Sequence, residues 1–230
     1  MNRTVPKVVV FDVIETLFSL EPLNANFQAA GFPGGSMRAW FSALLRDAFA
    51  LEVTADFQPF KSLAIANLRG LALFHQLKLS DDRLEEILGA VSDLPDYPDV
   101  KRAFELLRQA GLHIVALTNG SEKTTRAMFE NSQLEKYIDR FISIDEIRHW
   151  KPSPRVYHYA AESSNRSPCE LALVAAHAWD IHGAKRVGFQ TGFVSRHGEP
   201  GSLVEGAPDV CESSVEKVVR ALLSLPKKSP

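Results

Sequence analysis

The sequence predicts an α/β fold in which a doubly wound parallel sheet carries an inserted helical cap domain. Two observations predict it. Short apolar runs alternate with amphipathic helical patterns from about residue 95 onward, which is typical of a parallel sheet with crossover helices. A first apolar run, at residues 8–13, is separated from them by a long block of helical patterns. We therefore expect a discontinuous core domain, residues 1–18 and 95–230, with residues 19–94 as the cap.

The first apolar run is interrupted only by Asp12 and is rich in β-branched residues. A continuous apolar run, unlike an alternating one, indicates a strand that is buried on both faces, as in a parallel sheet. A charged residue at the C-terminal end of such a strand lies where open α/β sheets bind their ligands. Asp12 is therefore the first candidate functional residue.

The block that follows shows helical periodicity without strands. Residues 37–51 and 60–77 form amphipathic patterns, and Ser80 suits the N-cap of a further helix that runs to residue 91. The first of these helices places several aromatic side chains on one face. Such a face suits either closure of the cap on the core or a homodimer interface.

After a turn at residues 94–98, helices and strands alternate. We expect helices over residues 100–109, 121–131, 154–163 and up to 184, and strands over residues 112–118, 141–143, 171–175 and 192–194. The carboxyl ends of parallel strands meet at one edge of the sheet, so the polar residues that follow them gather in one crevice.

Composition narrows the class of protein. The chain has 230 residues, of which 45% are hydrophobic and 23% charged, and a formal net charge of -2, so neither nucleic acid nor an anionic membrane is an expected partner. No apolar stretch has the length of a membrane span or a signal peptide. Cys169 and Cys211 do not have the spacing of a disulfide framework or of metal ligands, and we expect both to be reduced thiols. We expect a cytoplasmic protein.

Four polar segments occupy the positions where the predicted strands end. They are Asp12 with Thr16, Thr118 with Asn119, Lys151 before a Pro-Ser-Pro helix entry, and His177 with Trp179 and Asp180. In this order and spacing the segments resemble the four motifs of the haloacid dehalogenase superfamily over essentially the whole chain. The resemblance is closest to the 2-haloacid dehalogenase branch, whose fourth motif carries a Trp-Asp pair and whose cap is helical. It implies a Rossmann-like core.

The resemblance also implies a mechanism. Asp12 would attack the substrate and form an aspartyl ester, because a desolvated and well-aimed carboxylate is a competent nucleophile. Lys151 would supply a fixed positive charge, and Asp180 would be the base that activates water. The simpler interpretation of Asp12 is an aspartate that caps the following turn, and that of Lys151 is a solvated surface lysine. Thr16 is expected to orient a carboxylate oxygen, and a local turn hydroxyl is an equally good interpretation.

His177 is a second candidate base, although a lone histidine is more often a structural group. The expected substrate contacts are Thr118, Asn119, Phe60, Trp179, Tyr157 and a cap arginine. Phe60 and Trp179 would strip water from the halogen, while ordinary core packing explains them equally well. Arg38 is the preferred candidate to clamp the substrate carboxylate, and Arg46 is the second, because arginine binds carboxylates in bidentate fashion.

Two positions separate a dehalogenase from a phosphatase. A phosphatase needs an acid two residues after the nucleophile to protonate a basic alkoxide, whereas a leaving halide needs no proton; this position is Ile14. The usual first acid of the fourth motif is Ala176, which removes a Mg²⁺ ligand. No metal and no cofactor is therefore expected, and the predicted reaction converts a short, anionic 2-haloalkanoic acid into a 2-hydroxy acid.

Other positions depart from the family pattern and keep alternatives open. Glu15 stands where a glycine is usual, and Ala175 and His177 replace a serine and an asparagine. A Mg²⁺-dependent phosphatase with a degenerate acid is one alternative. A catalytically silent relative that binds a small carboxylate or a protein partner is the other.

Overall fold

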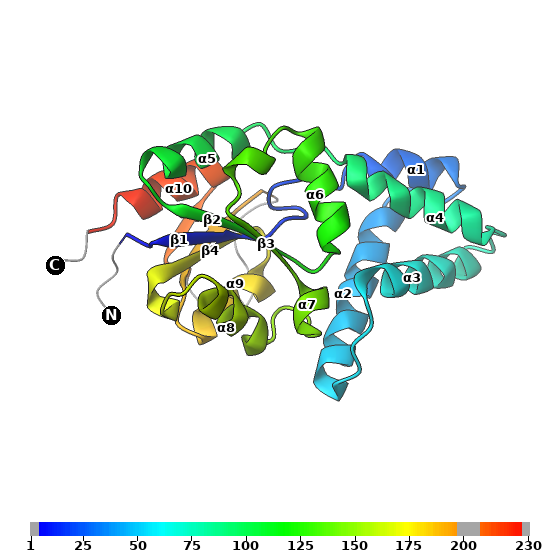
Figure 1. Ribbon diagram of the computed structural model, residues 1–230. Helices are drawn as coiled ribbons and strands as arrows, with labels where there is room; N and C mark the ends of the chain where they lie inside the picture. Colours follow the sequence, from blue (N-terminus) through cyan, green and yellow to red (C-terminus); the bar gives the residue numbers. More distant parts are fainter. Residues whose placement is uncertain (1–4, 197–207, 227–230) are drawn as a thin grey trace.

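The computed structural model describes residues 5–196 and 208–226. Within them one six-stranded sheet has the order β3-β2-β1-β4-β5-β6, and every adjacent pair is parallel (Figure 1). The strands are β1 (Val8–Phe11), β2 (His113–Thr118), β3 (Arg140–Ser143), β4 (Leu171–Ala175), β5 (Gln190–Val194) and β6 (Val210–Glu212). The prediction of a doubly wound parallel sheet is confirmed.

Helices cover both faces of this sheet, which explains the apolar run of β1. Val8 and Val10 contribute to the core on the side of α8 (Pro154–Ser163) and α9 (Ala178–Arg186). Val9 and Phe11 contribute to the core on the side of α5 (Val100–Gln109) and α10 (Val215–Leu223). Figure 1 shows these two helix layers above and below the strands. Successive side chains of a strand point to opposite faces, so a strand covered on both sides needs no polar alternation.

The strand order reverses at β1. From β1 the chain builds β2, α6 (Glu122–Asn131) and β3 on one side, then crosses through α7 (Ile144–Ile147) and α8 to β4, β5 and β6 on the other. Ligands of open α/β sheets bind at such a reversal, beyond the carboxyl ends of the strands. The residue that follows β1 is Asp12.

The turn after β1 is tight and includes a strained residue. Leu17 donates its N–H to Val13 O at 2.8 Å, and Glu15 donates to Phe18 O at 2.7 Å. Glu15 has φ of +64°, in the left-handed region that favours glycine. The strand was predicted to reach residue 13 but ends at Phe11, because this turn takes over the backbone hydrogen bonds.

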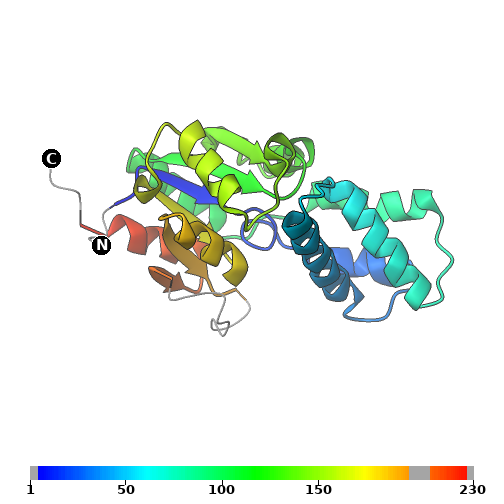
Figure 2. The same cartoon turned by 90° about the horizontal axis from the view of Figure 1, so that it is seen from below.

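Four helices and a 3₁₀ turn separate β1 from α5. They are α1 (Leu23–Ala29), α2 (Ser36–Thr54), α3 (Phe60–Phe74), α4 (Asp81–Gly89) and η1 (Ala90–Asp93). Figures 1 and 2 place them together at the end of the molecule opposite the two termini. Trp40 of α2 is fully buried: its ring lies 5.7 Å from that of Phe27 in α1, and its indole N–H donates to Ala64 O in α3 at 3.0 Å. The division into a core and a cap domain remains a prediction consistent with this arrangement.

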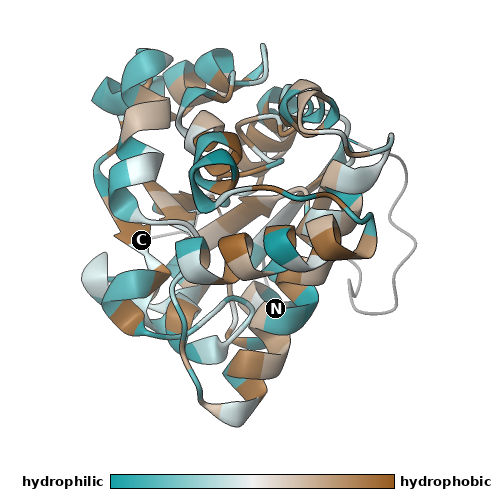
Figure 3. Cartoon of the chain, turned by 90° about the vertical axis from the view of Figure 1, so that its right-hand side faces the viewer, coloured by the Kyte–Doolittle hydropathy of each residue, from teal (hydrophilic) through white to brown (hydrophobic). Residues whose placement is uncertain are grey.

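The aromatic face predicted for α2 is turned partly toward the core. Phe41 lies 6.2 Å from the ring of His177, and Phe49 lies 5.5 Å from the ring of Trp179. The contacts favour the interpretation that this face closes on the core. Figure 3 views the helical end and shows hydrophilic and hydrophobic residues mixed on its helices. In the described ranges no helix combines the length and apolarity needed to cross a bilayer.

The expected elements are present with shifted ends. Ser80 and Ser121 cap α4 and α6, accepting hydrogen bonds from the backbone N–H groups of Arg83 and Thr124. The helix expected over residues 60–77 ends at Phe74, and the one expected to residue 91 changes to η1 after Gly89. The elements α1, α7, β6 and α10 were not predicted.

Close packing of α9 on α8 yields a stability prediction. A Cβ added at Gly183 would come within 2.6 Å of the Tyr157 ring and 2.7 Å of Pro152. Gly183→Ala should lower the free energy of unfolding by about 1–2 kcal/mol, because overpacking exceeds the gain in helix propensity. Urea unfolding measures this. Gly70→Ala is the matched control: its Cβ would meet nothing within 4 Å, so stability should stay equal or rise by up to about 1 kcal/mol. Equal effects of the two substitutions would contradict the packing argument.

Candidate active site

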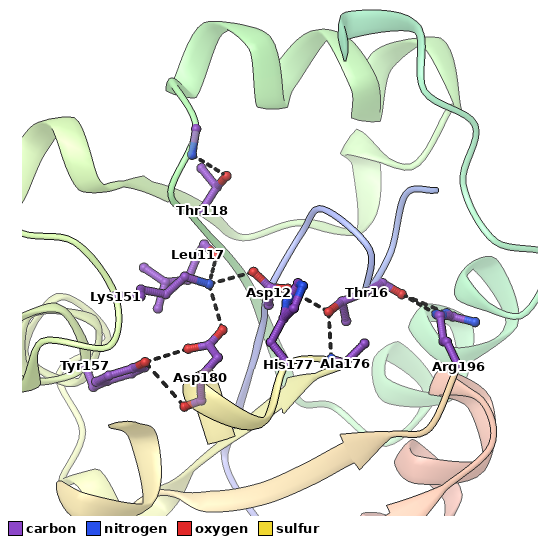
Figure 4. Close-up of polar contacts among 11 residues, drawn as sticks. Asp12, Thr16, Leu117, Thr118, Lys151, Tyr157, Ala176, His177, Asp180 and Arg196 are labelled. Atoms are coloured by element: carbon purple, nitrogen blue, oxygen red, sulfur yellow. Dashed lines mark hydrogen bonds and ion pairs between the residues drawn. The ribbon is translucent and has the colours of Figure 1, made fainter. Parts of the chain in front are cut away.

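A buried ammonium group connects the segments at the carboxyl edge of the sheet. Lys151 has no exposed side-chain surface, and its Nζ donates to Asp12 Oδ1 at 2.6 Å and to Asp180 Oδ2 at 2.7 Å. A third bond, at 3.2 Å, goes to Leu117 O at the end of β2. The three N–H donors of the ammonium group are thereby satisfied (Figure 4).

Asp12 is held from both sides. Its backbone N–H donates to Val174 O of β4 at 3.1 Å, which fixes the residue at the sheet edge. While Oδ1 faces Lys151, Oδ2 accepts hydrogen bonds from Thr16 Oγ1 at 2.7 Å and from His177 Nδ1 at 3.0 Å. Figure 4 shows these groups around the carboxylate. An ionised carboxylate only accepts hydrogen bonds, so His177 Nδ1 carries a proton in this contact.

The Thr16 hydroxyl connects the turn after β1 to the end of β4. It donates to Asp12 and accepts the backbone N–H of Ala176 at 2.8 Å. The side chain is fully buried. This geometry favours the prediction that Thr16 orients the carboxylate, rather than serving only as a local turn hydroxyl.

Asp180 lies in the first turn of α9 and is completely buried. Its Oδ1 accepts a hydrogen bond from the Tyr157 hydroxyl at 2.6 Å, while its Oδ2 faces Lys151. Tyr157 belongs to α8, so this pair also connects the two helices that cover one face of the sheet. Figure 4 shows the successive hydrogen bonds that join Tyr157 to Asp180, Asp180 to Lys151, and Lys151 to Asp12.

The two carboxyl groups differ in their pKa values. Burial alone raises the pKa of Asp12, but the charge of Lys151 and the interactions with His177 outweigh burial and hold this pKa well below its usual range. Burial raises the pKa of Asp180, and the negative charge of Asp12 adds to the rise, although Lys151 opposes it. Asp12 is thus the more firmly ionised carboxylate, and Asp180 is the better proton acceptor.

Lys151 itself stays protonated. Burial lowers the pKa of its ammonium group, but Asp12 and Asp180 together more than compensate, so this pKa is raised. The pKa of the Tyr157 hydroxyl is raised well above its usual value by burial and by Asp180, which keeps it a hydrogen-bond donor.

A small pocket of about 20 Å³ lies against Asp12. The core contributes Asp12, Ile14, Thr118, Asn119, Gly120, His177 and Trp179 to its lining, and the helices α2 and α3 contribute Phe41, Leu45 and Phe60. The imidazole of His177 stacks on Trp179 at 4.9 Å. The cap side of the pocket is therefore apolar, and the polar groups all come from the core.

Asn119 and Thr118 lie at this pocket with part of their hydrogen-bonding capacity already used. Asn119 Oδ1 accepts the backbone N–H of Lys151 at 3.2 Å, which leaves its amide N–H groups to donate elsewhere. Thr118 Oγ1 accepts the backbone N–H of Gly120 at 2.9 Å. Both residues are positioned to contact a small ligand.

The expectation for a cap arginine requires correction. Arg38 donates to the carboxylate of Glu21, and 58% of its side chain is exposed, so it does not line the pocket at Asp12. Arg46 pairs with the neighbouring Asp47 and is 73% exposed. The nearby acids hold both guanidinium groups on the surface, while Phe41 and Leu45 are the α2 residues that reach the pocket.

One residue that supports the site was not predicted. Arg196, after β5, donates from Nε and Nη2 to Thr16 O at 2.9 and 2.7 Å, and pairs with Asp99 at 3.2 Å. Its guanidinium group lies 3.6 Å from the ring centre of Tyr97. Arg196 thus holds the turn that carries Thr16. Arg196 binds a backbone carbonyl group, and because every residue has one, the sequence does not indicate this contact.

The site does not fit the magnesium ion that a phosphatase of this superfamily would require. Mg²⁺ needs several oxygen ligands, but Asp12 and Asp180 both already bind the Lys151 ammonium group, and Ile14 and Ala176 offer no side-chain oxygen. Across the described ranges no group of three or more His, Cys, Asp or Glu side chains is arranged to hold a metal. Lys151 Nζ lies between Asp12 Oδ1 and Asp180 Oδ2 and already supplies a positive charge there.

Comparisons with known proteins match most of the chain. Residues 6–188 match the family model of haloacid dehalogenase-like hydrolases. The chain is 27% identical to (S)-2-haloacid dehalogenase 4A of Burkholderia cepacia over 198 residues, 84% of this chain and 85% of that protein. It is 35% identical to (S)-2-haloacid dehalogenase 1 of Pseudomonas sp. (strain CBS-3) over 119 residues, 52% of each chain.

The fold is shared with a solved structure. The L-2-haloacid dehalogenase from Xanthobacter autotrophicus, with chloropropionic acid covalently bound, superposes with a TM-score of 0.88 at 23% identity. The superposition covers 96% of this chain and 99% of that one. The shared fold therefore extends over nearly the whole chain.

Removal of the buried cation should destabilise the protein in a pH-dependent way. In Lys151→Met, Asp12 and Asp180 lose their shared counter-ion, and the free energy of unfolding at pH 7 should fall by about 3–5 kcal/mol. Without the cation both folded-state carboxyl pKa values rise above their unfolded values, which stabilises the protonated folded state at low pH. The deficit relative to the wild type should therefore shrink as the pH is lowered.

Urea unfolding at several pH values measures this deficit. Lys101→Met, at an exposed position of α5, is the control and should change stability by no more than about 0.5 kcal/mol. A Lys151→Met deficit that stays constant or grows toward acid pH would be inconsistent with two uncompensated carboxylates.

Proposed function

The chain belongs to the haloacid dehalogenase-like hydrolase family, and from this premise we propose that it hydrolyses the carbon–halogen bond of a 2-haloalkanoic acid, releasing halide and a 2-hydroxy acid. The observation that carries the proposal is the Asp12 carboxylate, kept ionised by Lys151 beside Ile14, where an acid would otherwise stand. The names of the relatives support it, and they favour the (S) enantiomer.

In the first proposed step, an Asp12 oxygen attacks C2 of the substrate and the carbon–halogen bond breaks. The electron pair of that bond leaves with the halide, and an aspartyl ester forms. A halide is a very weak base, so this step needs no general acid and tolerates Ile14. The apolar side chains of Phe41, Phe60 and Trp179 line the pocket and exclude water from the reacting carbon.

In the second proposed step, water attacks the carbonyl carbon of the Asp12 ester. Asp180 accepts the proton of this water, a role that suits its burial and raised pKa. Lys151 contacts the Asp12 oxygen on one side and Thr16 and His177 contact the other, so donors are in place for the oxyanion that develops. Cleavage of the ester regenerates Asp12 and releases the 2-hydroxy acid. No metal enters either step.

The substrate carboxylate needs donors other than Arg38. Among the residues that line the pocket, Asn119 offers its amide N–H groups, Thr118 its hydroxyl and Trp179 its indole N–H, and all three belong to the core. We assign the contact with the substrate carboxylate to Asn119. His177 donates its Nδ1–H to Asp12 Oδ2 at 3.0 Å and orients the nucleophile. Asp180 is the base in this scheme.

The proposed reaction is tested by halide release from (S)-2-chloropropionate in the presence of EDTA. We expect turnover with chelator, and Asp12→Asn should lower it by about 10⁴-fold or more, because the nucleophile is lost. A single turnover in water enriched in heavy oxygen should place the label in the Asp12 carboxylate, as the ester mechanism requires. Mass spectrometry of the peptide that contains Asp12 detects this label.

The alternatives give different results in the same assay. Phosphate release from a generic phosphate ester, dependent on Mg²⁺ and without halide release, would indicate the phosphatase. No turnover of either substrate, with propionate binding unchanged in Asp12→Asn, would indicate a silent binding protein. Label found only in the product would argue for direct attack of water on C2.

The role of Asp180 predicts a shift in the pH profile. The hydrogen bond from Tyr157 lowers the pKa of Asp180, so Tyr157→Phe should raise this pKa further. Since a general base acts only when deprotonated, the acidic limb of the kcat profile should move to higher pH. Tyr159→Phe is the matched control on the same helix, because it also removes a hydroxyl bonded to a carboxylate, that of Glu146 at 2.9 Å. Its profile should not move. If the acidic limb of the kcat profile of Tyr157→Phe stays in place or moves to lower pH, Asp180 is not the general base.

A further inference from the structure

A second, larger cavity adjoins the pocket at Asp12. It has a volume of about 310 Å³ and lies between α3, α4 and η1 on the cap side and α6 on the core side. Ile14, Phe60, Thr118 and Gly120 line both spaces, so the large cavity opens beside the nucleophile. We call it the side cavity.

The two spaces differ in what they hold. About 20 Å³ next to Asp12 has room for roughly one water-sized group, such as a halogen or a methyl group. The side cavity, at about 310 Å³, is within the range of pockets that bind small organic molecules. A substrate with only one or two carbons would leave this cavity unused.

The lining of the side cavity suits an apolar occupant. Its apolar wall is formed by Ile14, Phe60, Leu88, Val91 and Met128. Most of the hydroxyl groups on the α6 side already bond within the protein. Ser121 Oγ donates to Thr124 Oγ1 at 2.9 Å, and Thr118 Oγ1 accepts from Gly120. Thr125 Oγ1 is the buried hydroxyl of this wall without a partner in the described part of the chain.

The charged residues of the side cavity neutralise each other at its rim. Lys61 of α3 and Glu85 of α4 form an ion pair at 2.6 Å, and 67% and 47% of their side chains are exposed. These exposed fractions place the pair at the solvent end of the cavity, away from Ile14 and Thr118. Among the described residues that line the side cavity, no cation is left unpaired for an anionic head group, whereas an alkyl chain can extend from Asp12 toward the rim.

We propose that the side cavity binds the alkyl chain on C2, so that the preferred substrate is a medium-chain 2-haloalkanoic acid and not a two- or three-carbon acid. This inference rests on the proposed function, since it places C2 of the substrate at Asp12. The halogen occupies the small pocket beside Asp12, and the chain extends past Ile14 and Phe60 between α4 and α6. The expected gain in kcat/KM is about fourfold for each buried methylene.

Gly89 offers a way to fill the side cavity. It is the last residue of α4, it lines the cavity, and its φ of -58° is ordinary for any residue. A Cβ added there would meet nothing within 4 Å, so Gly89→Leu can place its side chain in the cavity without a backbone clash. Gly70→Leu is the matched control. Gly70 also lies in a helix, has no neighbour within 4 Å of its Cβ position and does not line the side cavity.

The experiment compares kcat/KM for 2-chlorohexanoate and 2-chloropropionate in the three proteins. We expect the wild type and Gly70→Leu to prefer the six-carbon substrate by about tenfold or more, and Gly89→Leu to lose most of this preference. Equal use of both substrates by the wild type would overturn the proposal. So would a preference that Gly89→Leu retains in full.

Direct binding separates this proposal from the proposed function. Hexanoate and propionate carry no halogen and cannot react, so calorimetry reports binding alone. If no protein releases halide, the proposed function fails while the side cavity can still be judged. Tighter binding of hexanoate than of propionate by the wild type and Gly70→Leu, but not by Gly89→Leu, supports a chain-binding cavity. Equal binding of both acids by the wild type rejects it.

Discussion

The site depends on one buried ammonium group shared by two buried carboxylates. Lys151 reaches its partners from the segment that precedes α8, Asp12 follows β1, and Asp180 lies on α9. Burial of three charged groups is costly unless each is paired and hydrogen-bonded, and here each has at least two polar partners. The same arrangement divides the chemistry. Asp12 receives additional hydrogen bonds and is firmly ionised, while burial, together with the negative charge of Asp12, raises the pKa of Asp180 and makes it the better proton acceptor.

The cap contributes shape more than charge to this centre. Phe41, Leu45 and Phe60 reach the pocket, whereas the acidic residue Glu52 does not line it. Glu52 Oε2 accepts the backbone N–H of Trp150 at 2.8 Å, and its Oε1 pairs with His149 at 3.0 Å. Since Trp150 directly precedes Lys151, this contact connects the end of α2 to the segment that carries the ammonium group. A helical cap of this kind lowers the local polarity around charges supplied by the core.

Much of the site could be predicted because the sheet itself creates it. Apolar runs identified the strands, and parallel topology requires that Asp12, Thr118 and Asp180 meet at one edge. The prediction that Arg38 clamps the substrate was wrong because the sequence places this residue on a helix but does not identify the partner of its side chain. That partner is Glu21, which holds the guanidinium group at the surface. Arg196 was missed because it binds the carbonyl of Thr16. Such contacts depend on how loops fold over one another, and hydrophobic periodicity carries no information about that.

Ile14 shows how one residue can affect both catalysis and substrate choice. It follows the nucleophile by two positions, is 9% exposed, and lines both the small pocket and the side cavity. A carboxyl group at this position would bring a proton donor for a basic leaving group, together with a second negative charge beside Asp12. Isoleucine provides neither and instead forms an apolar wall between the two spaces. The residue that makes phosphate-ester cleavage difficult is therefore the residue past which an alkyl chain can extend, so reaction type and chain length are coupled at this position.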